Sequence, residues 1–71
     1  MESVKVSITT NYIKLEALLK LANVVSSGGE AKIAIQEGEV TVNGETCTQR
    51  GKKLRPGDVA VLGGELEITV R

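Results

Sequence analysis

Histidine, tryptophan and phenylalanine are absent from this chain of 71 residues, and cysteine, proline and tyrosine occur once each. Without histidine, the chain lacks the commonest general acid or base near neutral pH and the commonest metal ligand. Its one thiol, Cys47, can form neither an internal disulfide nor a thiolate cluster, and we expect an ordinary half-buried strand residue there. One tyrosine, Tyr12, provides no platform for stacking bases and is expected at the edge of the core. We therefore expect no catalytic residue, no metal and no cofactor.

Long apolar runs are absent too. No segment approaches the roughly 20 apolar residues that span a bilayer, and the first five residues lack the charged-then-apolar order of a signal peptide. A lone cysteine suits a reducing compartment, so a soluble, cytoplasmic protein is predicted. Seventy-one residues are enough for one domain, 1–71, which leaves little room for an enclosed pocket beside a core.

The periodicity of apolar residues predicts an α+β domain in which two short helices pack on a small, mostly antiparallel sheet, in the order β-α-α-β-β-β-β. Apolar and polar residues alternate over about 3–9, which is typical of a half-buried strand. Apolar residues at i, i+3, i+4 and i+7 then predict a helix over 11–22, with Thr10 or Asn11 as its N-cap. The two valines and two polar residues of 23–26 are typical of a connector.

Ser27 and Glu30 have the spacing of a capping box, in which each side chain bonds the other residue's backbone N–H, so a second helix is predicted over 28–37. Gly38 is expected to end it. Downstream, Asn43-Gly44 predicts a hairpin, because a type I′ turn needs positive φ at both positions. The remaining predicted elements are strands 39–42 and 45–49, an exposed basic loop over 50–55, a turn at Pro56-Gly57, and strands 59–62 and 65–70 around Gly63-Gly64.

Positive charge is concentrated although Lys+Arg and Asp+Glu number nine each. The predicted elements place seven basic residues on one continuous surface: Lys14, Lys20, Lys32, Arg50, Lys52, Lys53 and Arg55. The acids expected on the opposite side are Glu37, Glu39, Glu45, Glu65 and Glu67. Clustered lysines and arginines bind a phosphate backbone by releasing condensed counterions, with an affinity that falls steeply as salt rises. We therefore interpret this surface as an RNA interface rather than as ordinary solvated charge.

Four stretches of the chain form a combined motif, namely Lys14-Leu15-Glu16, Ser27-x-x-Glu30-Ala31-Lys32, Gly38-x-Val40-x-Val42-Asn43-Gly44 and Lys53-Leu54-x-Pro56-Gly57-Asp58-Val59. Over about 12–62 this pattern resembles the S-four domain, also called the alpha-L motif, which is the RNA-binding module of a small-subunit ribosomal protein. In Ser27-Gly28-Gly29 and Arg50-Gly51-Lys52-Lys53-Leu54 the chain is similar to the stand-alone bacterial members of the YbcJ and YaaA type, so we expect a module free of any catalytic domain.

The resemblance implies an L-shaped ridge, formed by the two helices and the following loop, that recognises structured RNA such as ribosomal or tRNA-like RNA. Lys14 and Lys32 are expected on its helical face and the basic residues of 50–55 on its loop face. It further implies a non-catalytic module in ribosome assembly or RNA metabolism. Its expected partners are structured RNA and a ribosome or assembly factor, with no membrane and no small-molecule substrate. Asp58 is expected to order the turn at Pro56-Gly57.

Gly28 and Gly29 depart from the family pattern, which has arginines directly after the serine that begins the second helix. The departure removes two expected phosphate contacts. In one interpretation, a phosphate approaches the free backbone N–H groups of Ser27, Gly28 and Gly29 in the first turn of the helix. In the other, the glycines serve tight packing or turn geometry.

Two other classes of function are compatible with these residues. In the first, the chain is a protein-interaction adaptor whose basic loop docks on an acidic partner, and co-purification that survives nuclease treatment would favour it. In the second, it is a sulfur carrier of the ubiquitin-like type. Such carriers need a Gly-Gly C-terminus, whereas Gly63-Gly64 is internal here and the last residues are Val70-Arg71.

Overall fold

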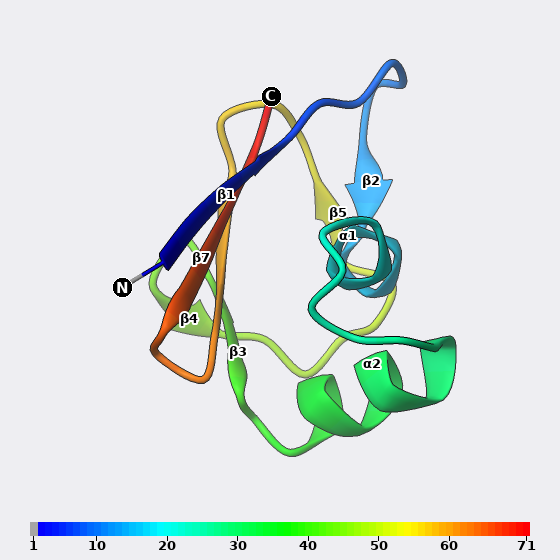
Figure 1. Ribbon diagram of the computed structural model, residues 1–71, viewed down its shortest axis with the longest axis vertical. Coiled ribbons are helices and arrows are strands. Elements are labelled where there is room, and N and C mark those ends of the chain that lie inside the picture. Colours follow the sequence, from blue (N-terminus) through cyan, green and yellow to red (C-terminus); the bar gives the residue numbers. More distant parts are fainter. Residues whose placement is uncertain (1) are drawn as a thin grey trace.

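The structure is a computed structural model that describes residues 2–71; Met1, which the expected domain included, lies outside the described residues. Within them, two helices and seven strands follow one another along the chain (Figure 1). In order, these are β1 (Glu2–Val6), β2 (Ile13–Lys14), α1 (Leu15–Leu21), α2 (Gly28–Gln36), β3 (Val40–Val42), β4 (Glu45–Thr46), β5 (Lys53–Leu54), β6 (Val59–Leu62) and β7 (Leu66–Val70). The α+β class is confirmed, and β2 and β5 are additions to the predicted order.

Five strands form one sheet in the order β1-β7-β6-β3-β4, and β2 pairs with β5 in a separate two-stranded sheet. β1 runs parallel to β7, while the other neighbours in the larger sheet are antiparallel. The larger sheet lies on one side of the molecule and both helices on the other, with β2 and β5 beside α1 (Figure 1). A small, mostly antiparallel sheet was expected, and the structure confirms it.

The core lies between the helices and the larger sheet, and none of the side chains buried within residues 2–71 is polar or charged. Its members are Val6, Leu15, Leu18, Leu19, Ala31, Ile35, Val40, Val42, Leu54, Ala60, Ile68 and Val70. Each fully buried leucine or isoleucine side chain stabilises the fold by about 1.5–3 kcal/mol relative to an exposed one. Neither helix of the described chain has the length and apolar character that crossing a membrane requires.

Helix α1 begins at Leu15, so the prediction that it begins near residue 11 was wrong. The reason is tertiary, because the residues just before Leu15 pair with β5 as strand β2. Lys14 is the N-cap and makes no side-chain capping bond. Thr10, one of the two expected caps, instead donates its hydroxyl to the carbonyl oxygen of Tyr12 at 2.7 Å. The helix ends as expected before the 23–26 connector, with Asn23 in the left-handed region at φ 60°.

Helix α2 begins at the predicted cap, since Ser27 Oγ accepts a hydrogen bond from the backbone N–H of Glu30 at 3.3 Å. The reciprocal half of the predicted box differs. The Glu30 carboxylate accepts from the backbone N–H and the hydroxyl of Ser26, both at 2.9 Å, one residue earlier than expected. Gly38, at φ 79°, ends the helix as predicted, and the N–H of Glu39 donates to the carbonyl of Ala34 at 3.2 Å, which is a Schellman pattern.

The hairpin between β3 and β4 has the predicted turn, with φ of 51° at Asn43 and 89° at Gly44. Its return strand was predicted over 45–49 but contains only Glu45–Thr46. Cys47 is half-buried as expected, yet it lies in the loop after β4 rather than in a strand. After Thr46 the chain leaves the edge of the sheet and runs toward the helices, where it forms β5.

Candidate nucleic-acid interface

The two-stranded sheet places two of the predicted RNA-binding lysines directly opposite each other. β2 and β5 are antiparallel, with Ile13 opposite Leu54 and Lys14 opposite Lys53. Leu54 is fully buried, which turns both lysines outward into solvent. Directly opposed residues have Cβ atoms about 4.5–5.5 Å apart, and like charges at such positions destabilise the pairing. A phosphate group bound between the two lysines would reduce their mutual repulsion.

The single aromatic side chain belongs to the same cluster. The ammonium group of Lys53 lies 4.9 Å from the centre of the Tyr12 ring, a cation–π distance. Tyr12 is 38% exposed, so it lies at the surface rather than at the edge of the core, where we expected it. A contact of this kind at an exposed site contributes about 0.5–1 kcal/mol. The ring therefore favours one position of the Lys53 side chain on the surface.

The backbone of residues 50–55, called the basic segment from here on, caps helix α1. The N–H of Leu15 donates to the carbonyl oxygen of Lys52 at 2.9 Å, and the N–H of Glu16 donates to that of Arg50 at 3.2 Å. These bonds satisfy N–H groups that have no partner inside the helix. They also explain why α1 needs no side-chain cap. As a result, the backbone of 50–53 is fixed against the start of α1, where Lys53 lies opposite Lys14.

The predicted exposed loop over 50–55 is only partly a loop. Lys53–Leu54 forms β5, and Leu54 belongs to the core, so this part of the prediction was wrong. The basic residues around it are all exposed, as expected: Arg50, Lys52, Lys53 and Arg55. A buried leucine between exposed basic residues anchors the segment, and this anchor holds the positive charge at a defined place.

Asn43 and Asp58 join the third and fourth stretches of the sequence motif by a hydrogen bond. Asn43 Nδ2 donates to Asp58 Oδ1 at 3.2 Å, and Asn43 Oδ1 accepts from the N–H of Val59 at 3.0 Å. The other Asp58 oxygen accepts from the N–H of Arg55 at 2.8 Å. This backbone bond, followed by the bond from Asn43, lowers the pKa of the Asp58 carboxyl below its ordinary value. Asp58 therefore orders the Pro56-Gly57 turn, as predicted, and ties it to the β3–β4 hairpin.

Two predicted RNA-binding residues lie apart from this cluster. Lys20 is in the last turn of α1, about 9 Å along the helix axis from Lys14. Lys32 is an exposed residue of α2. Figure 1 shows α1 between α2 on one side and β2 with β5 on the other. The structure thus gathers Lys14 and Lys53 at one end of α1, while Lys20 and Lys32 are exposed on the helices away from that pair.

The start of α2 contains the three residues predicted to offer backbone N–H groups to phosphate, namely Ser27, Gly28 and Gly29. A Cβ atom on Gly28 would meet nothing within 4 Å, and one on Gly29 would meet only Ser27 Oγ at 3.7 Å. Tight packing therefore does not require glycine at either position. The Glu30 carboxylate, bonded to Ser26, adds negative charge to this end of the helix. Those bonds, the backbone bond most, lower the pKa of the Glu30 carboxyl below its ordinary value.

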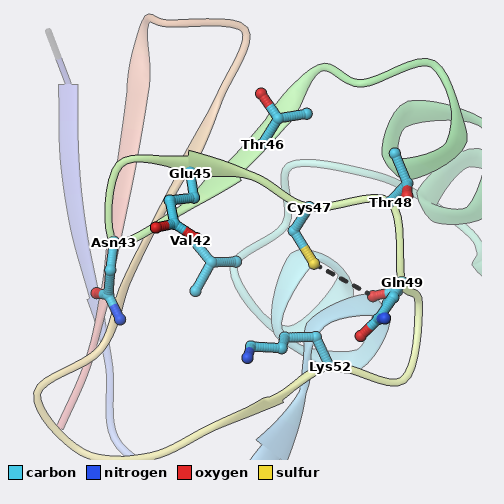
Figure 2. Close-up of a pocket in the computed structure, with 8 residues that line it drawn as sticks. All are labelled: Val42, Asn43, Glu45, Thr46, Cys47, Thr48, Gln49 and Lys52. Atoms are coloured by element: carbon cyan, nitrogen blue, oxygen red, sulfur yellow. Dashed lines mark hydrogen bonds between the residues drawn. The ribbon is translucent and has the colours of Figure 1, made fainter.

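A pocket beside the basic segment was not predicted. It has a volume of about 490 Å³ and lies under the β3–β4 hairpin (Figure 2). Its lining residues are Val42, Asn43, Glu45, Thr46, Cys47, Thr48, Gln49 and Lys52. The pocket forms because β4 ends after two residues and 47–49 arches away from the sheet. Glu45 therefore shares a pocket with Lys52, and the prediction that it lies opposite the basic surface was wrong.

The model of the S4 domain, a family written above as S-four, matches residues 6–71 of this chain. The chain belongs to the S4 domain family. This family match covers nearly all of the described elements, including the two-stranded sheet and the pocket. The resemblance drawn from the four sequence stretches is therefore confirmed.

Two S4 relatives are small proteins of similar length. One is 49% identical over 59 residues, covering 83% of each chain, and is named "Probable ribosome maturation protein RlbA" in Bacillus subtilis (strain 168). The other is 40% identical over 53 residues, covering 75% of this chain and 76% of the relative, and is named "Putative RNA-binding protein YbcJ" in Escherichia coli (strain K12). The predicted likeness to small, stand-alone S4 proteins is thereby confirmed.

Proposed function

We propose that this protein is a non-catalytic module that binds structured RNA through phosphate-backbone and shape contacts. Membership of the S4 domain family supports RNA binding in general, and the names of the two relatives point in the same direction. The observation that carries the finer proposal is the opposed pair of Lys14 and Lys53. Two exposed lysines held side by side form a surface whose charge a phosphate neutralises, and the resulting release of counterions drives binding.

Rigid placement of these charges favours a structured partner. Lys53 is positioned by the Tyr12 ring, and the basic segment is held by its backbone bonds to α1. Because the one aromatic ring contacts an ammonium group, it is not a free platform for a base. Proteins that bind single strands rely on such platforms. A fixed pattern of charge instead fits the regular phosphate spacing of an RNA helix, stem-loop or junction.

Ribosomal RNA is the partner that we propose, with ribosome assembly as the setting and the cytoplasm as the location. The name of the Bacillus relative, which describes ribosome maturation, supports this setting. The predicted contacts are the side chains of Lys14, Lys20, Lys32, Arg50, Lys52, Lys53 and Arg55, with the backbone at Ser27, Gly28 and Gly29 as further phosphate contacts.

The test is a binding titration with a structured ribosomal RNA fragment and a single strand of equal length, each at two salt concentrations. We expect the structured fragment to bind more tightly and its affinity to fall as salt rises. The double substitution Lys14→Gln and Lys53→Gln should weaken binding about tenfold or more, since hydrogen bonds to charged groups contribute about 1.5–3 kcal/mol each. It should also reduce the salt dependence by about one unit of slope per lysine.

The matched control is Lys5→Gln, which removes an exposed lysine from β1 in the larger sheet. It should leave affinity nearly unchanged. Equal binding of both RNAs, or equal losses for Lys5→Gln and the double variant, would contradict the proposal. Absence of binding at low salt, together with a protein partner that co-purifies after nuclease treatment, would favour the adaptor function instead.

A further inference from the structure

The pocket under the β3–β4 hairpin has a chemistry that phosphate binding alone does not use. Five of its residues face a common space in Figure 2: Val42, Glu45, Cys47, Gln49 and Lys52. The side chains of Thr46 and Thr48 point away from that space. The amide of Asn43 is already bonded to Asp58 and to the backbone of Val59. The pocket is therefore defined by one cation, one carboxylate, one amide and two small apolar groups.

These groups match the parts of a nucleotide. Lys52 can pair with an anionic phosphate, and it extends from the same basic segment that carries the proposed RNA contacts. Val42, which belongs to the core and is 6% exposed, and the half-buried Cys47, whose thiol donates to the Gln49 carbonyl at 3.7 Å, leave a small apolar wall against which part of a base can pack. Glu45 and Gln49 supply polar groups on either side of that wall (Figure 2). A volume of about 490 Å³ has room for one base with its ribose phosphate.

The carboxylate of Glu45 selects among bases, because an ionised carboxylate only accepts hydrogen bonds. Guanine presents two adjacent donors on its Watson–Crick edge, the ring N–H and the exocyclic amino group, which fit the two oxygens of one carboxylate. Adenine and cytosine place an acceptor beside their amino group, and uracil places carbonyls on both sides of its N–H. These three bases would therefore direct lone pairs at the carboxylate. Base edges become available in this way where RNA is unpaired, in loops and bulges.

We propose that this pocket binds a single unpaired guanosine of the RNA, bulged or looped out of a neighbouring helix. The inference rests on the proposed RNA binding and adds a base-specific contact to it. The helix phosphates contact Lys14 and Lys53, while the extruded nucleotide enters the pocket, its phosphate on Lys52 and its base edge on Glu45. The protein then recognises a structured RNA by shape and reads one base within it.

The experiment uses three RNA hairpins that differ at one position: fully paired, with a single bulged guanosine, and with a single bulged adenosine. Affinities are measured by fluorescence anisotropy. A good bidentate contact discriminates between bases by about 1–3 kcal/mol, so the bulged guanosine should bind about tenfold more tightly than the other two hairpins. In Glu45→Gln this preference should disappear, because an amide offers one acceptor and one donor. The affinity of Glu45→Gln for the paired hairpin should not fall.

Glu65→Gln is the matched control, since Glu65 is an exposed acid in the turn between β6 and β7. It should retain the preference for the bulged guanosine. As a second readout, backbone amide shifts of Cys47 and Gln49 should differ between complexes with the guanosine-bulged and the paired hairpin. Equal affinities for all three hairpins would overturn the pocket assignment and leave the proposed RNA binding standing. Failure of every hairpin to bind at low salt would overturn both.

Discussion

Lys14 and Lys53 face each other across the two-stranded sheet with no acidic residue in that register to separate them. Opposed like charges cost the folded state about 0.2–1 kcal/mol. We therefore predict that Lys14→Gln raises the free energy of unfolding by an amount in this range, although it weakens RNA binding. Urea denaturation at low salt measures the change. Lys20→Gln, in the last turn of α1, is the control and should give no such gain. A loss of stability in Lys14→Gln would contradict the repulsion.

The bond between Asn43 and Asp58 should appear as an energetic coupling. Asn43→Gly removes the side chain but tolerates φ 51°, and Asp58→Ala removes the acceptor. We expect each variant to lose about 1–2 kcal/mol of unfolding free energy. The double variant should lose less than the sum, with a coupling of about 0.5–1 kcal/mol. Asn23→Gly, at another asparagine with positive φ, tests the backbone change alone. Additive losses would mean that the two side chains act independently.

Acid should destabilise the protein in part through Asp58. Its backbone bond to Arg55 and its bond to Asn43 lower the pKa of this carboxyl in the folded state. A lowered folded pKa means that the unfolded chain binds the proton first. The stabilisation is thus fully present above the ordinary aspartate pKa of about 3.9 and is lost as pH falls below it. Unfolding free energies between about pH 5 and pH 2 should fall less steeply in Asp58→Asn. A decline as steep as that of the unsubstituted protein would refute this role.

Gly28 can be replaced because its Cβ position is open. Gly28→Arg would place a cation where the family pattern has an arginine. We predict that its affinity for structured RNA rises severalfold and that the salt dependence steepens by about one unit of slope. Gly28→Ala separates charge from helix propensity, which favours alanine over glycine by up to about 1 kcal/mol. It should change stability without steepening the salt dependence of binding. An unchanged affinity in Gly28→Arg would show that RNA docks away from the start of α2.

The sequence alone determined the elements whose signals are local. Ser27 caps α2, Gly38 ends it, and Asn43-Gly44 turns the hairpin, because each of these depends on bonds or dihedral angles within a few residues. The leucines of α1 were placed in the core for the same reason, since helical spacing alone brings Leu15, Leu18 and Leu19 to one face. The exposure of the basic residues was also predicted, because charged side chains stay in contact with water.

Tertiary structure decided what distant segments do to each other. β2 and β5 have two residues each and show no periodicity, so their pairing, which sets the start of α1 and accompanies the burial of Leu54, could not be predicted. The same pairing sets Lys14 against Lys53 and brings Lys53 over Tyr12. Because the chain leaves the sheet to form β5, β4 has only two residues, and the pocket lined by Glu45 and Lys52 lies where the chain departs. The residue types were readable in the sequence, but their neighbours depended on contacts between segments about forty residues apart, which no local pattern encodes.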